Sequence, residues 1–541
     1  MWYQDAIIYG IDVEKFADGN GDGIGDFIGL TSKLPYLRKL GITCIWLLPF
    51  FDTPNRDNGY DIRDYYRLNP QTGTMGDFIE FIRRAGEHGI RVIVDLVVNH
   101  TSTEHPWFEA ARRDARSRFR DYYIWSDSPP AIDTNNTTIF PGEEDNVWTY
   151  DEVANAYYFH RFYHFQPELN IANEEVREEV AKIMQYWMAF GVAGFRIDAA
   201  PIMIGENGLR RSEPRDPHGV LHDMNAVLRE RLPDGLMMGE ANVEPEKLSE
   251  FFGDGQGLGL LLNFYLNAFF FLALAREDAA PVAQALTELP QTPQDCGWGN
   301  FLRSLDELDL SRLTGEERQE TYARFAPDES MRLYGRGIRR RIAPMLDGDQ
   351  RRMEMVHSLI LSLPGTAVMM YGDEIGLGED LEVRGRDAVR VPMQWSGGRN
   401  GGFSDAPVKK MIQAPVQNGR FGYKSVNVDA QENDPASLLN KVRALVALRR
   451  QHELIHRAQL EAMETGHSAV LGHRCSDQGG GLLFLHNFSG RSARVDIGTA
   501  LGRAGQVKDL VNGEIYPIDG SRLKLQLRPY QYIWGQLEKV G

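Results

Sequence analysis

Eight short apolar segments with β-sheet propensity recur along the first 372 residues, and helix-like stretches separate several of them. The eight segments are Ala6–Asp12, Cys44–Pro49, Arg91–Asn99, Val192–Ala199, Leu236–Ala241, Gly259–Phe264, Asn300–Asp306 and Ala367–Gly372. Of the stretches between them, Met75–His88 and Glu174–Phe190 are helix-like, and the second places its apolar residues at the helical period. This α/β alternation predicts a parallel (β/α)8 TIM barrel, and an open doubly wound sheet is the alternative.

Two regions are too long to be ordinary loops of such a barrel, and the pattern changes again near the C-terminus. The segment 101–171 follows the third strand and is rich in Asn, Asp, Tyr and His, which predicts an inserted small domain. The long charged segment after Asp306 predicts a lid of short helices. Beyond residue 454, alternating runs between Gly, Asn and Pro turns predict an antiparallel β-sandwich domain. The expected domains are therefore 1–100 together with 172–454, then 101–171, and finally 455–541.

Charge and cysteine content narrow the classes of partner and the compartment. A formal net charge of −17 argues against nucleic acid as a partner. The longest apolar run, Leu258–Ala275, is interrupted by Asn263 and Asn267, so it predicts a buried strand that continues into a helix rather than a membrane span. The N-terminus has no basic signal-peptide region. Three widely spaced cysteines fit a reducing, cytoplasmic compartment, namely Cys44, Cys296 and Cys475. The oligomeric state stays open.

Acidic residues stand at the ends of several predicted strands, where barrel enzymes carry their catalytic groups. The fourth segment contains Asp198, the fifth Glu240 and the seventh Asp306. Arg196 lies two positions before Asp198, on the same side of the strand, and its charge should keep Asp198 ionised. Glu240 has no neighbouring cation in sequence, so it can hold a raised pKa and donate a proton. One ionised and one protonated carboxyl group is what retaining glycoside cleavage requires.

The alternative is that these acids merely end strands or cap the helices that follow. Three acids on three separate strands, with an arginine beside one of them, favour the catalytic interpretation. In that interpretation Asp306 is a third carboxylate, which holds the sugar hydroxyl groups.

Six short motifs occur in a fixed order along the chain, namely GDFIGL, DLVVNH, QPELN, GFRID, GEAN and YGDEIGL. In this order they resemble the motifs of glycoside hydrolase family 13, the α-amylase family. The resemblance implies a barrel with a domain inserted after its third strand and a C-terminal β domain. It also implies five site residues with known roles: Asp198 as nucleophile, Glu240 as general acid/base, Asp306 as transition-state stabiliser, and His100 and Arg196 as contacts to the bound glucose.

Further segments resemble a subgroup of that family that converts maltose into trehalose by intramolecular transglucosylation, namely GIRRRIAP, VPMQWS, RNGGFS and YKSVNVDAQ. The predicted function is therefore a double displacement on small α-1,4-glucosides such as maltose. One alternative is an α-glucosidase, which shares some of these segments and hydrolyses the glucoside or transfers glucose to other acceptors. A remote alternative, from another class, is an amylase-fold protein that only binds its ligand. Ala199 after Asp198 resembles members selective for α-1,4 linkages.

The resemblance also implies substrate contacts in two other motifs, NGYDIRDY and DAVRVPMQW. It implies that Asp61 and Arg390 pair across the base of the pocket and bind the non-reducing glucose, and that Tyr60 stacks on the sugar ring. The alternative places Tyr60 in the core and Arg390 on a solvated loop. One departure concerns strand seven, where the family usually has Asn-His before the aspartate and this chain has Ser304 and Leu305. The missing histidine removes a polar contact worth about 0.5–1.5 kcal/mol.

After the first predicted strand, oxygen-bearing side chains alternate with glycines in the sequence DGNGDGIGD. Hard oxygen ligands on a tightly turning loop predict a structural Ca²⁺ ion, and a Gly/Asp turn without a metal is the alternative. The predicted ligands are Asp18, Asn20, Asp22, Asp26 and, as similar family members imply, the backbone carbonyl of Ile24. Position twelve of the loop is Gly29 rather than Glu, so it is not an EF-hand. We expect no organic cofactor, and a second ion near Asn99 and Glu168 stays open.

Overall fold

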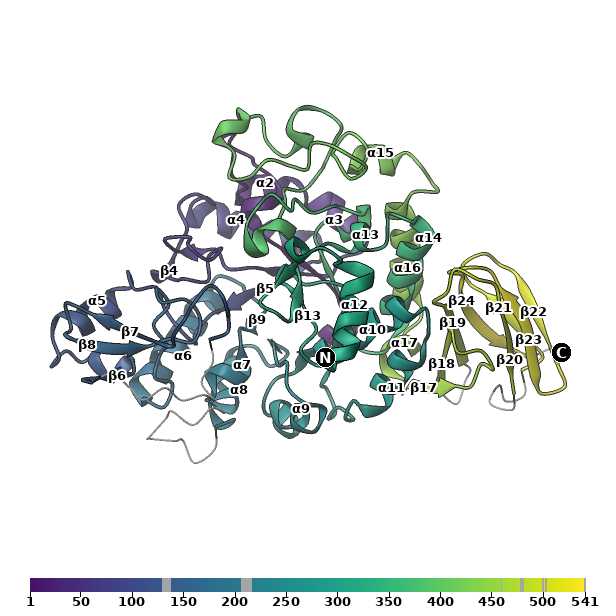
Figure 1. The fold of residues 1–541 in the computed structure, drawn as a ribbon, viewed down its shortest axis with the longest axis horizontal. Coiled ribbons are helices and arrows are strands. Elements are labelled where there is room, and N and C mark those ends of the chain that lie inside the picture. Colours follow the sequence, from purple (N-terminus) through teal and green to yellow (C-terminus); the bar gives the residue numbers. More distant parts are fainter. Residues whose placement is uncertain are drawn as a thin grey trace.

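A computed structural model describes the chain except for residues 129–137, 206–216, 459, 477–480, 499–500, 502–503 and 540–541. Figure 1 shows a central body with strands enclosed by helices, a smaller lobe on one side and a β domain on the other. The lobe follows the third barrel strand in the chain, and the β domain holds the last eight strands.

The central body is a closed barrel of eight parallel strands, so the predicted fold is confirmed. Around the barrel each strand pairs with the next in the chain, and the last pairs with the first. Residues 7–11 of the first strand are all buried, as expected for strands covered on both faces. The strands are β1 (Ile7–Ile11), β2 (Cys44–Leu47), β5 (Arg91–Leu96), β9 (Gly194–Ile197), β10 (Leu236–Gly239), β11 (Leu260–Leu262), β12 (Gly297–Phe301) and β16 (Thr366–Met370).

Helices surround the barrel and begin at polar capping residues. Thr74 forms a capping box with Asp77 at the start of α4 (Met75–Glu87), and Asn173 caps α6 (Glu174–Ala189), so both predicted helices are present. Asn263 ends the buried strand β11 and caps α10 (Phe264–Arg276), which explains the long apolar run as a strand followed by a helix. Among the described residues, no helix is long and apolar enough to cross a membrane.

The seventh strand lies earlier in the sequence than predicted. It spans Gly297–Phe301, not 300–306, so Asp306 lies on the loop five positions beyond the strand. The glycines of GWGNF hide the strand from propensity reasoning. At Gly299 an added Cβ would lie 3.4 Å from the side chains of Leu262 and Val368, which is ordinary van der Waals contact.

Two excursions from the barrel contain small sheets. The lobe after β5 holds α5 (Pro106–Arg113) and an antiparallel sheet of β6 (Trp125–Ser126), β8 (Ala156–Phe159) and β7 (Trp148–Asp151). The segment after β12 is not a set of short helices alone. It has a three-stranded sheet of β13 (Leu308–Asp309), β15 (Gly337–Ile338) and β14 (Arg332–Leu333), with the helix α12 (Gly315–Phe325).

The C-terminal region is an antiparallel eight-stranded sheet, as predicted, in the order β17-β18-β19-β24-β21-β22-β23-β20. Leu485 and Ile533, from the middle of this order, share one core with Val495 of the last strand, so the sheet folds back on itself. The strands are β17 (Leu460–Met463), β18 (Val470–Ser476), β19 (Gly481–Asn487), β20 (Ala493–Ile497), β21 (Gln506–Asp509), β22 (Ile515–Asp519), β23 (Arg522–Leu527) and β24 (Tyr532–Glu538).

Two buried histidines of this sheet contact the barrel helix α14 (Gln350–Ser362). The Nε2 atom of His486 lies 2.9 Å from the Ser358 hydroxyl, and that of His473 lies 3.2 Å from the Ser362 carbonyl. A third buried histidine, His357, lies on α14 itself. Burial lowers the pKa of His357 and His473 to about 4, and it lowers the pKa of His486 well below its usual value.

These histidines predict that the interface loses stability in acid. A histidine whose pKa is lowered by folding stabilises the folded state above its unfolded pKa of about 6.5, and this contribution disappears as the pH falls toward the folded pKa. We expect the free energy of unfolding to fall between pH 6.5 and pH 4, and His486→Gln to make this fall shallower. Urea unfolding at a series of pH values measures both slopes, and equal slopes for the two proteins would contradict the assignment.

Candidate active site

A cavity of about 250 Å³ opens where the carboxyl ends of the barrel strands meet. Five of the predicted site residues line it, and they come from four different strand ends and the loop after β2: Tyr60, His100, Asp198, Glu240 and Asp306. Three further predicted residues, Asp61, Arg196 and Arg390, are buried and are not part of its lining. The cavity therefore brings together the three acids that the sequence places on separate strands.

Arg196 lies beneath the cavity and joins the two principal carboxylates. Its Nη1 atom donates to Asp198 at 2.5 Å and to Asp95 at 2.8 Å, and its Nη2 atom donates to Glu240. Glu240 has no neighbouring cation in sequence, but the guanidinium of Arg196, on β9, reaches across to it at the end of β10. Retaining glycosidases hold their two carboxyl groups about 5 Å apart, and a shared guanidinium is compatible with such a pair.

The two carboxyl groups differ in exposure. The Asp198 side chain is 9% exposed, and burial raises its pKa although Arg196 opposes the shift. The Glu240 side chain is 29% exposed. Burial of its carboxyl group raises the pKa to about 8, although the charge of Arg196 acts in the opposite direction. Glu240 thus keeps its proton at neutral pH, which is the state that a general acid needs.

Asp306 has the opposite environment. Burial favours its neutral form, but Arg386 and Arg390 outweigh this effect and lower its pKa to about 2. Both arginines donate to the same oxygen, Oδ1, at 2.7 Å and 2.8 Å. Asp306 is therefore a fixed negative charge beside Asp198 and Glu240, suited to stabilise a developing positive charge.

His100 and Tyr60 form one wall of the cavity. The Nε2 atom of His100 lies 3.1 Å from the carbonyl oxygen of Tyr60, which can only accept a hydrogen bond. Burial lowers the pKa of His100 to about 4, so the ring is neutral at pH 7. The Tyr60 hydroxyl donates to Asp95 at 3.3 Å, and the ring is 6% exposed. Both residues lie where the resemblance places them.

The predicted pair of Asp61 and Arg390 does not form. The Asp61 carboxylate turns away from the cavity, where it accepts hydrogen bonds from the Thr53 hydroxyl and from the backbone N–H groups of residues 56 and 57. Arg390 lies behind Asp306 and also donates to the Leu305 carbonyl at 2.9 Å. Asp61 is therefore a loop-capping residue, and Arg390 acts on the site through Asp306 and through the Tyr60 ring, whose centroid lies 5.8 Å from its guanidinium carbon.

Sequence reasoning missed the acid–arginine pair that does line the cavity, Asp57 and Arg386. Arg386 donates to Asp57 at 2.5 Å, and the side-chain amide of Gln166 donates to the other Asp57 oxygen at 2.9 Å. Asp57 reaches the cavity because Asn58 and Gly59 have positive φ angles of 49° and 87°, which makes a tight turn before Tyr60. The Asp-Asn-Gly sequence is the signal that identifies this turn.

Because Asp57 lines the cavity and Asp61 does not, we expect their substitution to have different effects on activity and stability. Asp57→Asn should lower kcat/KM on a small α-glucoside by about 10–100-fold, because it weakens a charge-assisted contact of about 1.5–3 kcal/mol in the cavity. Asp61→Asn should mainly lower the melting temperature, because it disturbs the loop cap. Steady-state kinetics and thermal unfolding of both variants make the comparison, and a larger kinetic loss for Asp61→Asn would restore the original assignment.

The two excursions from the barrel close the sides of the cavity. The lobe contributes Phe140 and Phe162, and the segment after β12 contributes Glu307 and Arg336. Arg336 joins the two, because it donates to the Ile139 carbonyl and to Glu307, each at 2.8 Å. The segment after Asp306 thus meets the lobe beside the cavity through Arg336 and also through Tyr334, whose ring centroid lies 4.9 Å from that of Phe140.

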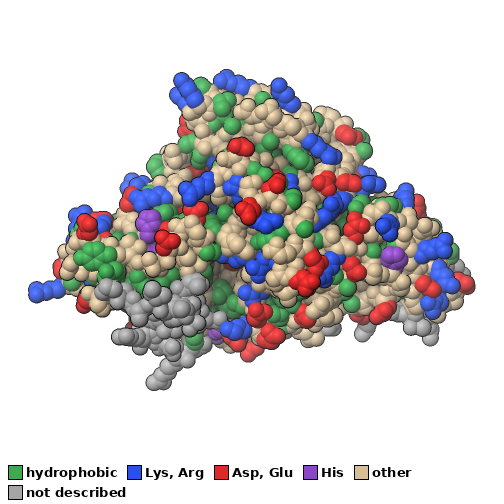
Figure 2. Space-filling model, in the orientation of Figure 1, with side chains coloured by type: hydrophobic (Ala, Val, Ile, Leu, Met, Phe, Trp, Pro, Cys, Tyr) green, Lys and Arg blue, Asp and Glu red, His purple; other side chains and the backbone are tan. Residues whose placement is uncertain are grey.

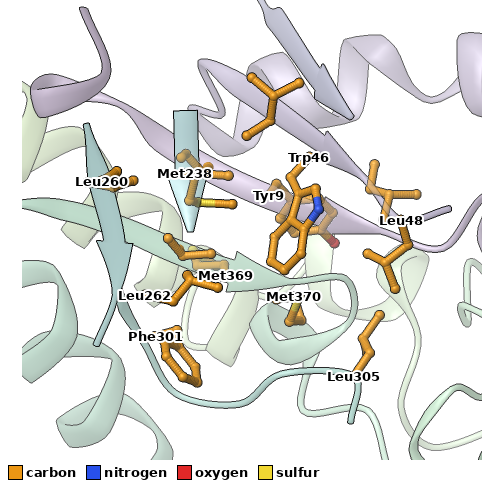
Figure 3. Close-up of a cluster of buried hydrophobic side chains, with 14 of the residues drawn as sticks. Tyr9, Trp46, Leu48, Met238, Leu260, Leu262, Phe301, Leu305, Met369 and Met370 are labelled. Carbon is orange, nitrogen blue, oxygen red and sulfur yellow. The ribbon is translucent and has the colours of Figure 1, made fainter. Parts of the chain in front are cut away.

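Leu305, which replaces the usual histidine, turns away from the cavity into the barrel core. It is 3% exposed and lies with Trp46, Leu48 and Met370 in the apolar cluster of Figure 3. Its neighbour Ser304 lines the cavity instead. This end of the cavity therefore has one polar ring fewer than the family pattern and an apolar layer beneath it.

The carboxylate oxygens of the predicted metal loop accept hydrogen bonds from the backbone of the loop itself and of the helix that follows it. Asp18 accepts hydrogen bonds from the backbone N–H groups of Asn20, Gly21 and Gly23, and Asp26 accepts from those of Gly19, Asn20 and Gly29. Asp22 similarly accepts from the N–H of Ile24. Within the described residues, no group of three His, Cys, Asp or Glu side chains is arranged to hold a metal. The loop nevertheless contains the kinds of oxygen donor that calcium prefers, namely carboxylates, the amide oxygen of Asn20 and the backbone carbonyl of Ile24.

Comparison with known proteins identifies the family. The model of the α-amylase catalytic domain matches residues 10–294 and 337–458. A trehalose synthase from Thermus thermophilus is 40% identical over 100% of this chain, which spans 56% of that protein. A trehalose synthase/amylase from Mycobacterium tuberculosis is 40% identical over 90% of this chain and 82% of its own length.

A solved structure agrees with these matches. The trehalose-6-phosphate hydrolase of Bacillus licheniformis superposes with a TM-score of 0.80 at 25% identity, covering 99% of this chain and 100% of that one. The chain therefore belongs to the α-amylase family, glycoside hydrolase family 13, as its motifs predict.

Proposed function

We propose that this protein is a retaining α-glucoside-active enzyme that converts maltose into trehalose by intramolecular transfer of glucose. The observation that carries the proposal is the pair of carboxyl groups, Asp198 and Glu240, held by one arginine at the wall of a single cavity. The 40% identity to two proteins named trehalose synthase supports the choice of substrate.

The proposed reaction has two displacements. An oxygen of Asp198 attacks the anomeric carbon of the non-reducing glucose, while Glu240 gives its proton to the glucosidic oxygen and that C–O bond breaks. A β-glucosyl–Asp198 ester and free glucose result. Glu240, now ionised, takes the proton from the anomeric hydroxyl of the released glucose. That oxygen attacks the anomeric carbon, and the bond to Asp198 breaks.

Hydrolysis is the competing outcome, because water can attack the same ester. The name of the Mycobacterium tuberculosis relative includes an amylase, so both outcomes have precedent among the relatives. The aromatic wall of Phe140 and Phe162 and the Arg336 bridge favour transfer, because they limit the access of water and the escape of glucose.

Proton NMR of maltose incubated with the enzyme tests the proposal. Trehalose that appears in step with the loss of maltose, with less glucose than trehalose, is the expected result. Glucose as the sole product would replace transfer by hydrolysis. A binding protein without catalysis would leave maltose unchanged, and so would the Asp198→Asn control.

We also propose that Ca²⁺ binds the loop of Asp18, Asn20, Asp22, Ile24 and Asp26. The support is the alternation of oxygen donors and the exposure of Asn20 and Asp22, which leaves the loop open to an ion. The role would be structural, because none of these residues lines the cavity of the site.

We propose separately that the protein is cytoplasmic. The support is that its three cysteines are buried and form no disulfide bond.

Calcium should therefore stabilise the protein without taking part in the reaction. Binding to the folded state alone adds about 2.7 kcal/mol at a hundredfold excess over Kd. We expect chelation by EDTA to lower the melting temperature and added Ca²⁺ to restore it, with no response in Asp22→Ala. Calorimetry with and without the ion measures this, and an Asp22→Ala variant that still responds to Ca²⁺ would place the ion elsewhere.

A further inference from the structure

A second cavity, of about 710 Å³, lies apart from the catalytic cavity. Its floor includes the first residues of β12 and β16, Gly297 and Thr366, whereas the catalytic groups follow the last residues of their strands. The loop 289–296 forms one wall, and the connection to the C-terminal sheet forms another, with His456 and Leu460. The two cavities share no lining residue. Figure 2, which shows one face of the molecule, has acidic and basic side chains interspersed over its surface.

The lining of this second cavity is polar but nearly uncharged. Amides and hydroxyls share it with leucine and proline side chains, and Asp295 and His456 are the titratable side chains of the described lining apart from Cys296. The described lining residues include no lysine or arginine, so these residues offer an anionic ligand no counter-charge. The amides and hydroxyls belong to Gln4, Gln291, Gln294, Asn263, Asn300, Thr287, Thr292 and Thr366.

Three polar groups of the lining, two side-chain amides and one indole N–H, have unused hydrogen-bonding capacity. In the described part of the chain, no protein group bonds to the side-chain amides of Gln291 and Gln294, which are exposed on the rim. The indole N–H of Trp298 also has no protein partner, although the ring is only partly exposed. The Trp298 ring packs edge-to-face on Phe252, with ring centroids 5.3 Å apart, which fixes its orientation.

The walls are rigid, which reduces the entropic cost of binding. Pro290 and Pro293 restrict the rim loop, and the Tyr3 hydroxyl donates to the Asp295 carbonyl at 2.8 Å. On the floor, the Asn300 amide donates to the Pro364 carbonyl at 2.8 Å. A concave site of this volume, with an oriented aromatic ring and available amide groups, has the dimensions of a small-molecule site.

We propose that this cavity is a second binding site that takes a neutral oligosaccharide, with Trp298 as the aromatic contact and Gln291 and Gln294 as hydroxyl-binding groups. A sugar matches the lining because it is uncharged, carries hydroxyls that both donate and accept, and has C–H faces that pack on an indole. That the ligand carries many hydroxyl groups follows from the cavity alone. The choice of maltose, trehalose and maltotriose as probes rests on the proposed function.

Equilibrium binding in a catalytically impaired background tests the site. Isothermal titration of Asp198→Asn with maltose, trehalose and maltotriose should reveal two sites per chain for at least one sugar. Adding Trp298→Ala should weaken one of them by tenfold or more and leave the other unchanged. Gln291→Ala with Gln294→Ala changes only exposed side chains, so it tests the same site without risk to folding. Trp148→Ala is the matched control, because Trp148 is a partly exposed tryptophan that lines neither cavity.

Turnover provides an independent readout. With the catalytic residues intact, Trp298→Ala should retain the kcat of the unmodified enzyme on maltose, because Trp298 does not line the catalytic cavity. If the proposed reaction fails but Trp298-dependent binding persists, the second site stands without it. A single binding event in Asp198→Asn for every probe would overturn the proposal. Two events that are both unchanged by the Trp298 and glutamine variants would do so equally.

Discussion

Glu240→Gln is expected to lower kcat on maltose by about 10²–10⁴-fold, the usual contribution of a general acid–base residue. Glutamine has nearly the same shape but carries no transferable proton, so the glucosidic oxygen of maltose must leave unprotonated. With 4-nitrophenyl α-glucoside the leaving group needs little help, so the first displacement should remain fast. For 4-nitrophenyl α-glucoside, the rate of the burst phase, which reports the first displacement, should therefore fall much less than kcat on maltose.

The same variant should respond to added azide, because a small anion can attack the glucosyl ester without a general base. The expected product is α-glucosyl azide, because attack on the β-glucosyl ester inverts the anomeric carbon a second time. Asp198→Asn is the matched control, since it removes the nucleophile and should be inactive on both substrates and unresponsive to azide. Equal losses on both substrates with no azide product would remove Glu240 from the acid/base role.

The pH dependence of kcat/KM gives a second signature of Glu240. The acid must be protonated in the free enzyme, and the protein raises its pKa to about 8. Activity on maltose should therefore fall as the pH rises through about 8, and Glu240→Gln should lose this alkaline limb.

The barrel could be predicted from the sequence because its strands are short, apolar and separated by helices with clear caps. Strand β12 was placed three residues too late at its start, because Gly297 and Gly299 lower the local strand propensity. The acids were found because each stands at or after a strand end, where the topology forces them to converge. Alternation along the chain thus carries the fold and the positions of the acids.

The pairing of side chains across the site could not be predicted in the same way. Asp57 and Asp61 are four residues apart, and only the turn at Asn58 and Gly59 decides which of them enters the cavity. Arg386 and Arg390 are also four apart, and both reach Asp306, but only Arg386 reaches Asp57. The lining from Phe140 and Arg336 depends on contacts between two excursions that are nearly 200 residues apart in the chain, for which a single sequence has no local signal.

Arg196→Met is expected to be the most destabilising single change near the site. The guanidinium is 3% exposed and is the partner of three carboxylates, Asp95, Asp198 and Glu240. Removing one partner of a buried ion pair costs about 3–5 kcal/mol, because it leaves uncompensated charge in a low-dielectric interior. Chemical denaturation should show a loss of this size at pH 7. Arg384→Met is the control, since Arg384 is 84% exposed in its pair with Glu143 and should have little effect.

The pH dependence separates lost charge compensation from lost packing. Without Arg196, the three carboxyl groups escape the penalty by binding protons, so their pKa values in the folded state should rise further above the unfolded values. An acid whose pKa is raised by folding stabilises the folded state at low pH and loses that contribution as the pH rises through its folded pKa. The deficit of Arg196→Met relative to the unmodified protein should therefore shrink between pH 8 and pH 5. A deficit that stays constant over this range would mean that Arg196 acts through packing, and that the carboxylates do not depend on its charge.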